Sequence, residues 1–530
     1  MRKLILSLAA AAALPSCTTM RANAPSAQMW LTTADAAHKL AKQPVVPSAG
    51  PVTGDEAVSI DPSRRFQQIH GFGAAMTDAS AELFSRLPDD KRRAIMVELF
   101  GRENGGLGLS FTRLTVGASD FSRSHYSYDD PPGNVADPAL RYFSIEPARE
   151  YVLPRVREAL EINPDLKVMI SPWSAPAWMK TTRSMIKGQL EPRYHAAFAE
   201  YLARTIEAFT REGVPVSMLT IQNEPDFEPP DYPGMRVSPS QRAEIIGRHL
   251  GSLLKRRNIR TQILDWDHNW NQPQQPLTVL ADPAARQYVS GIAWHCYEGD
   301  VPAQSIVHEA YRDKQVWHTE CSGGAWNEKF KTWESSLAWM TDKLIIGAAN
   351  HWARGSLLWN LALDPAGGPH AGGCPACRGV LTIDPASGAI TREVEYYVLG
   401  HASRFIFPGA YRVGVAKRGD EVEAAAFLNP DGSKVAILYR RSRAGPIAIG
   451  LSGRRYLVSL PAGSVVTLRW SAEASVEAPC WRHYLLAEAF KSCPAPALSS
   501  CIAVAETRPV ASRCARLRAM TRRCSRRRRT

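Results

Sequence analysis

Short apolar runs recur between residues 68 and 364, and each one ends in polar or aromatic residues. Longer amphipathic stretches separate most of them, such as residues 192–213, whose apolar positions repeat at helical spacing. Strands that alternate with helices pair in parallel, so eight such units predict an α/β fold of the closed (β/α)₈, or TIM, barrel type. The runs are "QIHGFGAAMTD", "GLSFTRLTVGASDFS", "LKVMISPWSAPAWMK", "VSMLTIQNEP", "TQILDWDHNW", "GIAWHCYEG", "QVWHTECSGG" and "GSLLWNLALD".

The pattern changes to short alternating runs with turns beyond residue 400. The segment "EVEAAAFLNPDGSKVAILYRR" places an Asn-Pro-Asp-Gly turn between two strand candidates. We therefore expect a catalytic (β/α)₈ barrel over residues 55–400 and a small all-β sandwich over residues 401–470. A strand near residues 57–67 is expected to be shared with the sandwich.

The N-terminal end is typical of an exported protein. Arg2 and Lys3 precede an apolar run that is too short to span a bilayer, which predicts a secretory signal over residues 1–24. The segment "LPSC" offers an alternative lipoprotein site at Cys17, and a lipid there would be the only expected membrane attachment. The protein is predicted to be periplasmic, secreted or lipid-anchored. Residues 25–54, rich in Ala, Pro and Thr, are interpreted as a linker.

The chain has 530 residues and a formal charge of +13, but the charge is concentrated at one end. Residues 471–530 contain 11 Arg, 1 Lys and 4 Glu, which is +8, so +5 remains for all other residues. This Arg/Cys-rich tail has no apolar period and is predicted to be disordered. An exported protein meets little nucleic acid, so no nucleic-acid partner is expected.

Two glutamates follow apolar runs: Glu224 ends the fourth run and Glu320 ends the seventh. The strand ends of a barrel meet at one mouth, so both carboxylates are expected in one cleft. Hydrolysis of an acetal requires such a pair, one carboxyl protonated and the other ionised. Asn223 could bond a sugar hydroxyl beside Glu224. The alternative is that each glutamate forms an ion pair at a strand end.

Tryptophans also cluster at or near the ends of the runs. Sugars stack their C–H faces on indole rings, although a single Trp is more often a core residue. Several at one rim would favour a carbohydrate site. The residues are Trp173, Trp178, Trp266, Trp270, Trp294 and Trp359.

The runs closely resemble glycoside hydrolase family 30, a family of retaining enzymes that includes glucosylceramidases, β-1,6-glucanases and some xylanases. The similar segments occur in the family's order over about Phe66 to Val413. They are "GFGAAMTDASA", "RLTVGASDFS", "SPWSAPAWMKT", "QNEP", "GIAWHCY", "TECSGG", "WNLALDPAGGP" and "YYVLGHASRFIFPGAYRV".

The resemblance implies Glu224 as general acid/base and Glu320 as nucleophile. It further implies six supporting positions: Asn223 beside the acid, Asp120 and Trp173 on the sugar, Trp359 beneath the ring, Tyr297 near the nucleophile, and Arg113 holding the carboxylates. His268 is expected at the rim. A purely structural, buried guanidinium is the alternative for Arg113.

Four cysteines lie near these segments. Cys296 and Cys321 adjoin Tyr297 and Glu320. They could form a Cys–His nucleophile with His295 or His318, or they could be buried packing residues. Strand alternation turns each cysteine away from its functional neighbour, which favours packing. The Cys-x-x-Cys pair Cys374 and Cys377 is ambiguous alone, and export favours a disulfide over metal or redox chemistry.

Together these observations predict a retaining glycosidase that acts on β-glucosyl bonds, in glucosylceramide-like glycolipids or β-1,6-glucan. A xylanase of the same family is one alternative, and a non-catalytic carbohydrate-binding protein with the same cleft is another. No metal and no cofactor are expected, and the predicted partner is a carbohydrate or glycolipid substrate.

Overall fold

The computed structural model describes residues 26–55 and 57–472. The predicted signal at residues 1–24, with Cys17, lies outside this part of the chain, as does the predicted tail from residue 473 onward. Within the described part, no helix combines the length and the apolar character that crossing a bilayer requires.

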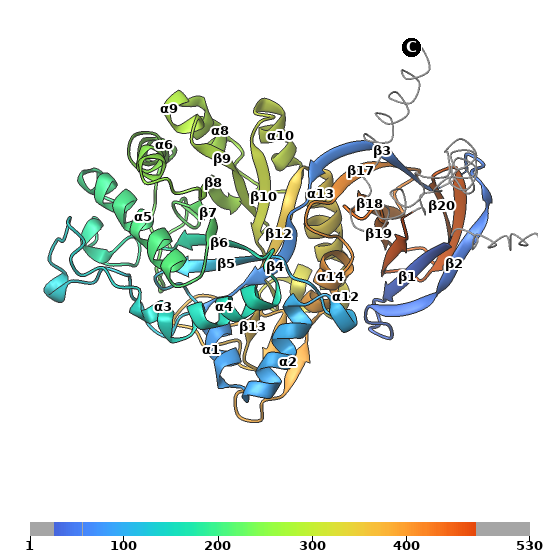
Figure 1. Ribbon diagram of the computed structural model, residues 1–530, viewed down its shortest axis with the longest axis horizontal. Coiled ribbons are helices and arrows are strands. Elements are labelled where there is room, and N and C mark those ends of the chain that lie inside the picture. The colour runs from blue at the N-terminus through green and yellow to red at the C-terminus, as the bar shows by residue number, and fades with distance from the viewer. Residues whose placement is uncertain (1–25, 56, 473–530) are drawn as a thin grey trace, which may run out of the picture. The chain divides into compact units, whose positions relative to one another are not determined.

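Eight parallel strands close into a barrel, which confirms the predicted fold. Each predicted run overlaps one of these strands, and neighbours in the barrel follow chain order, so that β12 closes on β4. Figure 1 shows the strands surrounded by helices. The strands are β4 (Gly71–Ala75), β5 (Phe111–Val116), β6 (Lys167–Pro172), β7 (Val216–Thr220), β8 (Gln262–Asn269), β9 (Val289–His295), β10 (Gln315–Glu320) and β12 (Ala353–Asn360).

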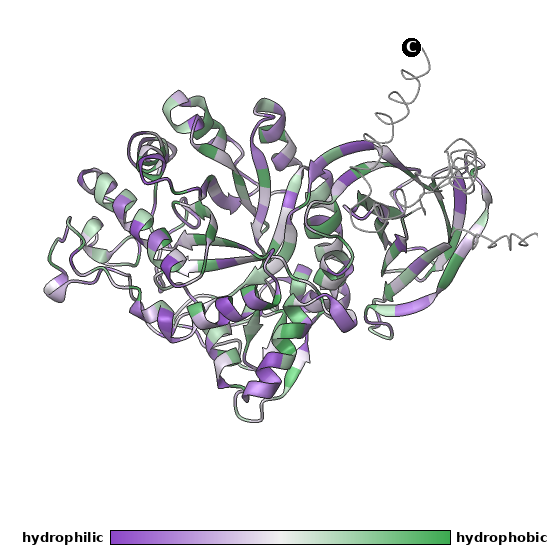
Figure 2. Cartoon of the chain, in the orientation of Figure 1, coloured by the Kyte–Doolittle hydropathy of each residue, from purple (hydrophilic) through white to green (hydrophobic). Residues whose placement is uncertain are grey.

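The helices bury one face against the barrel, and Figure 2 shows them banded with hydrophobic and hydrophilic residues. α5, for example, buries Phe198, Leu202 and Phe209 at helical spacing. The helices are α1 (Asp78–Arg86), α2 (Asp89–Phe100), α3 (Glu146–Glu150), α4 (Val152–Ile162), α5 (His195–Arg211), α6 (Pro239–Glu244), α7 (Gly251–Arg256), α8 (Gln274–Ala281), α9 (Pro283–Arg286), α10 (Pro302–Ala310), α11 (Glu328–Lys331), α12 (Trp333–Met340), α13 (Ala348–Asn350) and α14 (Val394–Ser403).

A separate apolar layer fills the inside of the barrel. Seven of the eight strands each contribute one residue to it, and all are nearly inaccessible to solvent. Because this layer fills the space between the strands, the cleft at their carboxyl ends has a rigid floor. The layer consists of Phe111, Met169, Met218, Leu264, Ala293, Trp317 and Leu357.

The second body is an all-β domain of nine strands, which agrees with the predicted sandwich and extends it. Its hydrogen bonds close into a ring, so it has no free sheet edge. N-terminal strands lie among C-terminal ones, as the blue and orange ribbons of Figure 1 show. The strands are β1 (Ser26–Thr32), β2 (Ala41–Pro51), β3 (Val58–Gln68), β17 (Tyr411–Lys417), β18 (Val422–Leu428), β19 (Lys434–Arg440), β20 (Gly445–Leu451), β21 (Arg454–Leu460) and β22 (Ser464–Trp470).

The predicted linker at residues 25–54 is wrong. β1 pairs with β22 and β2, and β1 buries Ala27, Met29 and Leu31 in the core of the sandwich. The prolines of β2 made this segment resemble a linker. The pairing of β2 with β21 is sparse and therefore tolerates residues that lack an N–H. The expected shared strand is present as β3, which pairs with both β17 and β20.

His401 fastens the end of α14 to the β domain. Its Nδ1 lies 2.8 Å from the hydroxyl of Thr467 on β22, and its Nε2 lies 2.8 Å from the hydroxyl of Thr32 on β1. Burial lowers the pKa of His401 to about 3, so the ring is neutral and supplies one donor and one acceptor. One side chain thereby joins both termini of the β domain to the barrel.

We expect His401→Ala to lower the free energy of unfolding by roughly 2–4 kcal/mol, because two buried hydroxyls lose their hydrogen bond to the ring and a cavity is left. Urea denaturation would measure this change. His38→Ala, at an exposed position, is the matched control and should change stability by less than about 0.5 kcal/mol. Equal midpoints for both variants would contradict this role of His401.

Candidate active site

The carboxyl ends of the barrel strands surround one cleft of about 710 Å³. Eight of the nine residues predicted to act on the sugar line this cleft, and Arg113 is buried beneath it. Seven different strands therefore contribute to a single site. The lining residues are Asp120 after β5, Trp173 after β6, Asn223 and Glu224 after β7, His268 on β8, Tyr297 after β9, Glu320 on β10 and Trp359 on β12.

Glu224 and Glu320 face each other across the cleft. Carboxylate oxygens of the two lie within 4.8 Å of each other and of a ring nitrogen of His295. His295 Nδ1 lies 3.1 Å from Glu224 Oε1 and 3.9 Å from Glu320 Oε1. Carboxyl groups about 5–5.5 Å apart are characteristic of retaining glycosidases, whereas about 6.5–9.5 Å is needed to place a water for inversion.

Arg113 on β5 donates a hydrogen bond to Glu320 from below. Its Nη2 also donates to Asn223 Oδ1 at 2.7 Å and to Asp267 Oδ2 at 2.6 Å. The guanidinium carbon lies 4.7 Å from the ring centre of Trp173, within cation–π range. Arg113 is thus both a buried structural cation and a support of the site, so both interpretations of this residue from the sequence apply.

Asp267 is a residue of this network that the sequence analysis missed. It accepts hydrogen bonds from Arg113 and from the hydroxyls of Ser171, Thr220 and Thr319. Burial alone would raise its pKa, but the charge of Arg113 and these donors hold the pKa of Asp267 far below its usual range. Trp266 and Asp267 have φ of 77° and 56°, and the register of β8 shifts there, so simple alternation places Asp267 on the wrong side.

His295 bridges the two halves of the site. Its Nε2 lies 3.1 Å from Asp267 Oδ1, and its Nδ1 faces Glu224. Burial opposes a charge on the ring, but the carboxylates of Glu320 and Asp267 outweigh it and raise the pKa of His295 to about 9. The ring is therefore an imidazolium at neutral pH and donates from both nitrogens. The sequence had suggested His295 only as a base for a cysteine.

Glu224 occupies a strained backbone position, with φ of 47°. Its N–H donates to the carbonyl of Asp267 at 3.0 Å, which fixes the turn that carries the carboxyl group. Burial raises the pKa of Glu224, and the charge of Glu320 adds to the rise, while the hydrogen bond from His295 opposes it. Glu224 is thus the member of the pair that favours the protonated form.

Asp120 is a second carboxyl group that holds its proton. Burial and the charge of Glu320 raise the pKa of Asp120 to about 8, and its Oδ1 accepts no hydrogen bond from the described residues. The loop after β12 approaches it closely. A Cβ atom on Gly373, where φ is 78°, would lie 2.5 Å from the Cβ of Asp120, so this approach requires glycine.

Two of the six tryptophans named from the sequence line the cleft. Trp173 and Trp359 stack with ring centres 4.9 Å apart and planes at 18°. The expectation for the other four is wrong, because their rings are buried in the core, with at most 1% of each residue exposed. Trp326 and Phe227 line the outer part of the cleft instead, at 36% and 42% exposure, and no strand pattern marked them.

His268 lies on β8 as expected for a rim residue, and its ring stacks on His295 at 6.1 Å with an 8° interplanar angle. Burial and the positive charge of His295 hold the pKa of His268 well below its usual value, so it is neutral. Neither ring nitrogen bonds to a described residue. A neutral imidazole facing the cleft can donate to or accept from a sugar hydroxyl.

The loop after β12 contains a disulfide between Cys374 and Cys377, and both residues line the cleft. Within it, β14 (Cys377–Arg378) pairs with β11 (Gly323–Gly324), which begins three residues after Glu320, the last residue of β10. The loop is thereby tied to the strand end that carries Glu320. A further small sheet follows, with β13 (Ala362–Leu363), β15 (Leu381–Ile383) and β16 (Ile390–Arg392).

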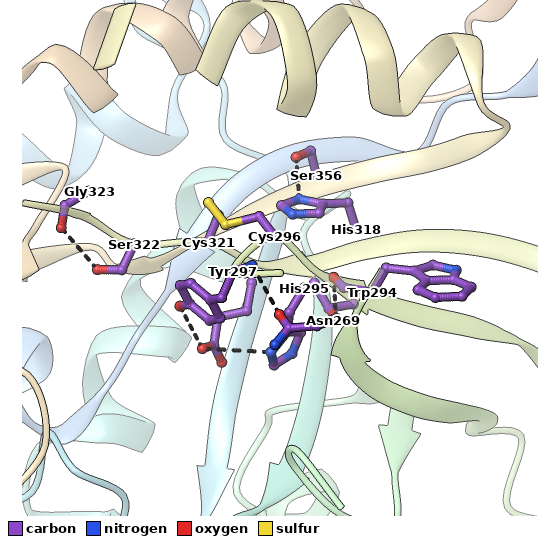
Figure 3. The surroundings of a disulfide bond; sticks show 12 residues. Asn269, Trp294, His295, Cys296, Tyr297, His318, Cys321, Ser322, Gly323 and Ser356 are labelled. Atoms are coloured by element: carbon purple, nitrogen blue, oxygen red, sulfur yellow. Dashed lines mark hydrogen bonds and ion pairs between the residues drawn. A yellow bond between two sulfur atoms is a disulfide. The ribbon is translucent and has the colours of Figure 1, made fainter. Parts of the chain in front are cut away.

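A second disulfide joins Cys296 to Cys321 (Figure 3). The interpretation of these cysteines as separately packed residues is therefore incomplete. Alternation does turn both away from the cleft, and both are buried, but β9 and β10 are neighbours. Since His295 and Glu320 are register partners, the residues that follow them meet.

Two groups of described residues place three ligand-type atoms within 4.8 Å of one another: Glu224 with His295 and Glu320, and His195 with Glu244 and His249. In the first group, Arg113 and the charged His295 already supply positive charge to the carboxylates. A metal is not needed there to balance them.

Fold and site together define a class of protein: barrel enzymes that hydrolyse glycosidic bonds. The comparison with known proteins narrows the class. Residues 69–406 match the glycosyl hydrolase family 30 TIM-barrel domain, and residues 409–468 match the beta sandwich domain of that family. The chain belongs to glycosyl hydrolase family 30, and the protein is a glycosidase.

Characterised relatives share most of the chain. An endo-1,6-β-D-glucanase of Trichoderma harzianum is 31% identical over 448 residues, which cover 79% of this chain and 87% of the relative. The lysosomal acid glucosylceramidase of Mus musculus is 28% identical over 436 residues, which cover 78% and 83%. A solved endo-β-1,6-glucanase matches with a TM-score of 0.78 and 29% identity, over 84% of this chain and 100% of that chain.

We expect Asp267→Asn to lower the free energy of unfolding by about 3–5 kcal/mol, because it leaves the buried Arg113 and His295 with one anion fewer. Chemical denaturation would measure the loss. Asp300→Asn is the matched control: Asp300 forms an exposed ion pair with Lys343, worth at most about 1 kcal/mol. The role assigned to Asp267 fails if both variants unfold at the same denaturant concentration.

Proposed function

We propose that the protein hydrolyses β-glucosidic bonds with retention of the anomeric configuration, with Glu320 as nucleophile and Glu224 as general acid/base. The single observation that carries this proposal is the approach of the two carboxylates to within 4.8 Å. At this separation one carboxylate can reach the anomeric carbon while the other contacts the leaving oxygen.

The reaction proceeds in two displacements. Glu320 attacks the anomeric carbon while the proton of Glu224 passes to the departing oxygen, which leaves a glycosyl ester on Glu320. Glu224, now ionised, then removes a proton from water, and the water attacks the same carbon and releases Glu320. Hydrogen bonds from Arg113 and from the Tyr297 hydroxyl, the latter at 2.9 Å, favour Glu320 as an anion before the attack.

Polar groups around the pair are suited to bind the sugar. Asp120 retains a proton at neutral pH and can donate it in a hydrogen bond to a hydroxyl, while Asn223 is held by Arg113 with its amide at the cleft. Neutral His268 adds a group that can donate or accept. The stacked indoles of Trp173 and Trp359 offer an apolar surface for one face of the ring.

The charge of the cleft favours a neutral glucan over a xylan that bears glucuronic acid. Among the described residues that line the cleft there is no Lys or Arg. A substrate carboxylate would therefore meet like charges without a cationic partner. Besides the protonated Asp120 and Glu224, the acidic lining residues are Asp226, Asp231, Glu298 and Glu320.

Within β-glucosides, we place β-1,6-glucan first and glucosylceramide-like glycolipids second. The solved glucanase supports this order, and so do the exposed rings of Phe227 and Trp326 at the outer cleft, which can stack on a further sugar unit. We also propose that the protein is exported by means of the predicted signal. Two disulfides among the described residues are compatible with an oxidising compartment.

We expect Glu320→Gln to reduce the release of sugar from β-1,6-glucan by at least about 10³-fold while binding of the glucan is kept. Reducing-sugar assays and calorimetry would measure turnover and binding separately. A panel with glucosylceramide, glucuronoxylan and an aryl β-glucoside would rank the substrates. If wild-type protein bound glucan but hydrolysed none of the panel, the chain would be a carbohydrate-binding protein instead.

The pH profile should show which carboxyl is the acid. Because Glu224 must be protonated in the first displacement and its pKa is raised, kcat/KM should fall as the pH rises through that pKa. Glu224→Gln should lose about 10²–10⁴-fold in rate and abolish this basic limb. Glu228→Gln, in the same loop but bound to Gly188 and Arg236, should keep the limb. An unchanged basic limb in Glu224→Gln would refute the assignment.

A further inference from the structure

The disulfide between Cys296 and Cys321 lies directly beside the proposed nucleophile. β9 ends at His295 and β10 ends at Glu320, and these two residues are register partners at the last rung of the ladder. The bonded cysteines are the residues that directly follow the two strands, and both are almost completely buried, at 2% and 0% exposure.

The covalent bond adds a fixed rung where the ladder stops. The register of β10 shifts between His318 and Glu320, so the strand is irregular at Thr319, just before the glutamate. Backbone pairing alone therefore defines this end of β10 weakly. The disulfide fixes the distance between the ends of β9 and β10 at the level of the active site.

Tyr297 and Glu320 are the residues next to the bonded cysteines, and they contact each other. The Tyr297 hydroxyl donates to Glu320 Oε1 at 2.9 Å, and the Tyr297 N–H donates to Asn269 Oδ1 at 2.9 Å (Figure 3). The hydrogen bond between the phenol and the carboxylate and the disulfide thus connect the same two strand ends.

We propose that Cys296 and Cys321 are positioning residues, whose disulfide holds the Tyr297 hydroxyl against Glu320 and so keeps the nucleophile aimed at the anomeric carbon. This inference rests on the proposed role of Glu320. Displacement of a reacting group by about 1 Å can reduce a rate about 10²-fold, so a bond that fixes two neighbouring strand ends acts on catalysis directly.

The proposal makes the site sensitive to thiols. Two equivalents of a thiol reductant would reduce the bond to two cysteine thiols and form one equivalent of the oxidised reductant. The reduced strand ends could then separate by the slack of the irregular ladder. Full activity would accordingly require the oxidising surroundings that the export signal predicts.

Other groups also surround Glu320 and would have to stay constant in the test. They come from every element that faces it: Arg113 on β5, Asp120 after β5, Glu224 and Tyr232 after β7, Asp267 on β8, and His295 on β9. None of them adjoins the disulfide in sequence except His295, whose own bonds go to Asp267 and Glu224.

The test is a double-mutant cycle between the disulfide and Tyr297, measured as kcat and KM on an aryl β-glucoside. Cys296→Ala with Cys321→Ala should lower kcat about 10-fold or more with little change in KM. Tyr297→Phe should also lower kcat with little change in KM. Combining all three changes should add almost nothing to Tyr297→Phe alone.

Cys374→Ala with Cys377→Ala is the matched control. It removes a disulfide from the wall of the cleft without touching Tyr297, so its effect should fall on KM rather than on kcat and should add to that of Tyr297→Phe. In this background, Cys296–Cys321 is the only disulfide among the described residues. Reversible reduction of that protein, followed by thiol labelling and circular dichroism, repeats the test without a folding step.

A purely structural disulfide would give a different result: lower thermal stability, an unchanged kcat of the folded protein, and effects that add to those of Tyr297→Phe. That result would overturn the proposal. Failure of the proposed function is recognised separately, because wild-type oxidised protein and the control variant would then hydrolyse no glucoside at all.

Discussion

The buried ion pairs of Arg113 are the interaction on which the rest of the site depends. Arg113 and the imidazolium of His295 supply two positive charges, and Asp267 and Glu320 supply two negative ones. The set is balanced only while Glu224 is protonated. An unbalanced charge in such a position costs several kcal/mol, so the protein environment itself holds the proton on Glu224.

In the mechanism that we propose, the same balance is kept after the first displacement. Formation of the glycosyl ester removes the charge of Glu320, and loss of its proton gives Glu224 a charge in its place. The two cations then still face two anions, Asp267 and Glu224, which His295 contacts with its two nitrogens. A site that remains neutral through both steps avoids a reorganisation of the surrounding dipoles, and preorganised sites of this kind gain most in rate.

The positions of the strand ends could be predicted from the sequence, because apolar runs that end in polar residues place those residues at one mouth of a barrel. Glu224 and Glu320 followed from this rule and from the family resemblance, whereas Arg113 followed from the resemblance alone. Asp267 did not follow, because the register shift in β8 overrides the alternation on which the sequence reasoning relied. Pairing between cysteines also escaped it, since alternation describes one strand and a disulfide depends on two. β1 and β2 pair with each other, but they were missed because their other partners, β22 and β21, lie more than 400 residues away along the chain.

The irregular backbone around Asp267 and Glu224 has one physical origin. Trp266, Asp267 and Glu224 all have positive φ, a conformation that costs roughly 1–3 kcal/mol for residues with a side chain. The strained residues support each other, because the N–H of Glu224 bonds to the carbonyl of Asp267. Such distortions persist only where the surrounding structure leaves no alternative, and the apolar layer within the barrel provides that rigidity. The regular part of the fold is therefore what allows its active end to be irregular, and regular patterns in a sequence predict the support better than the site.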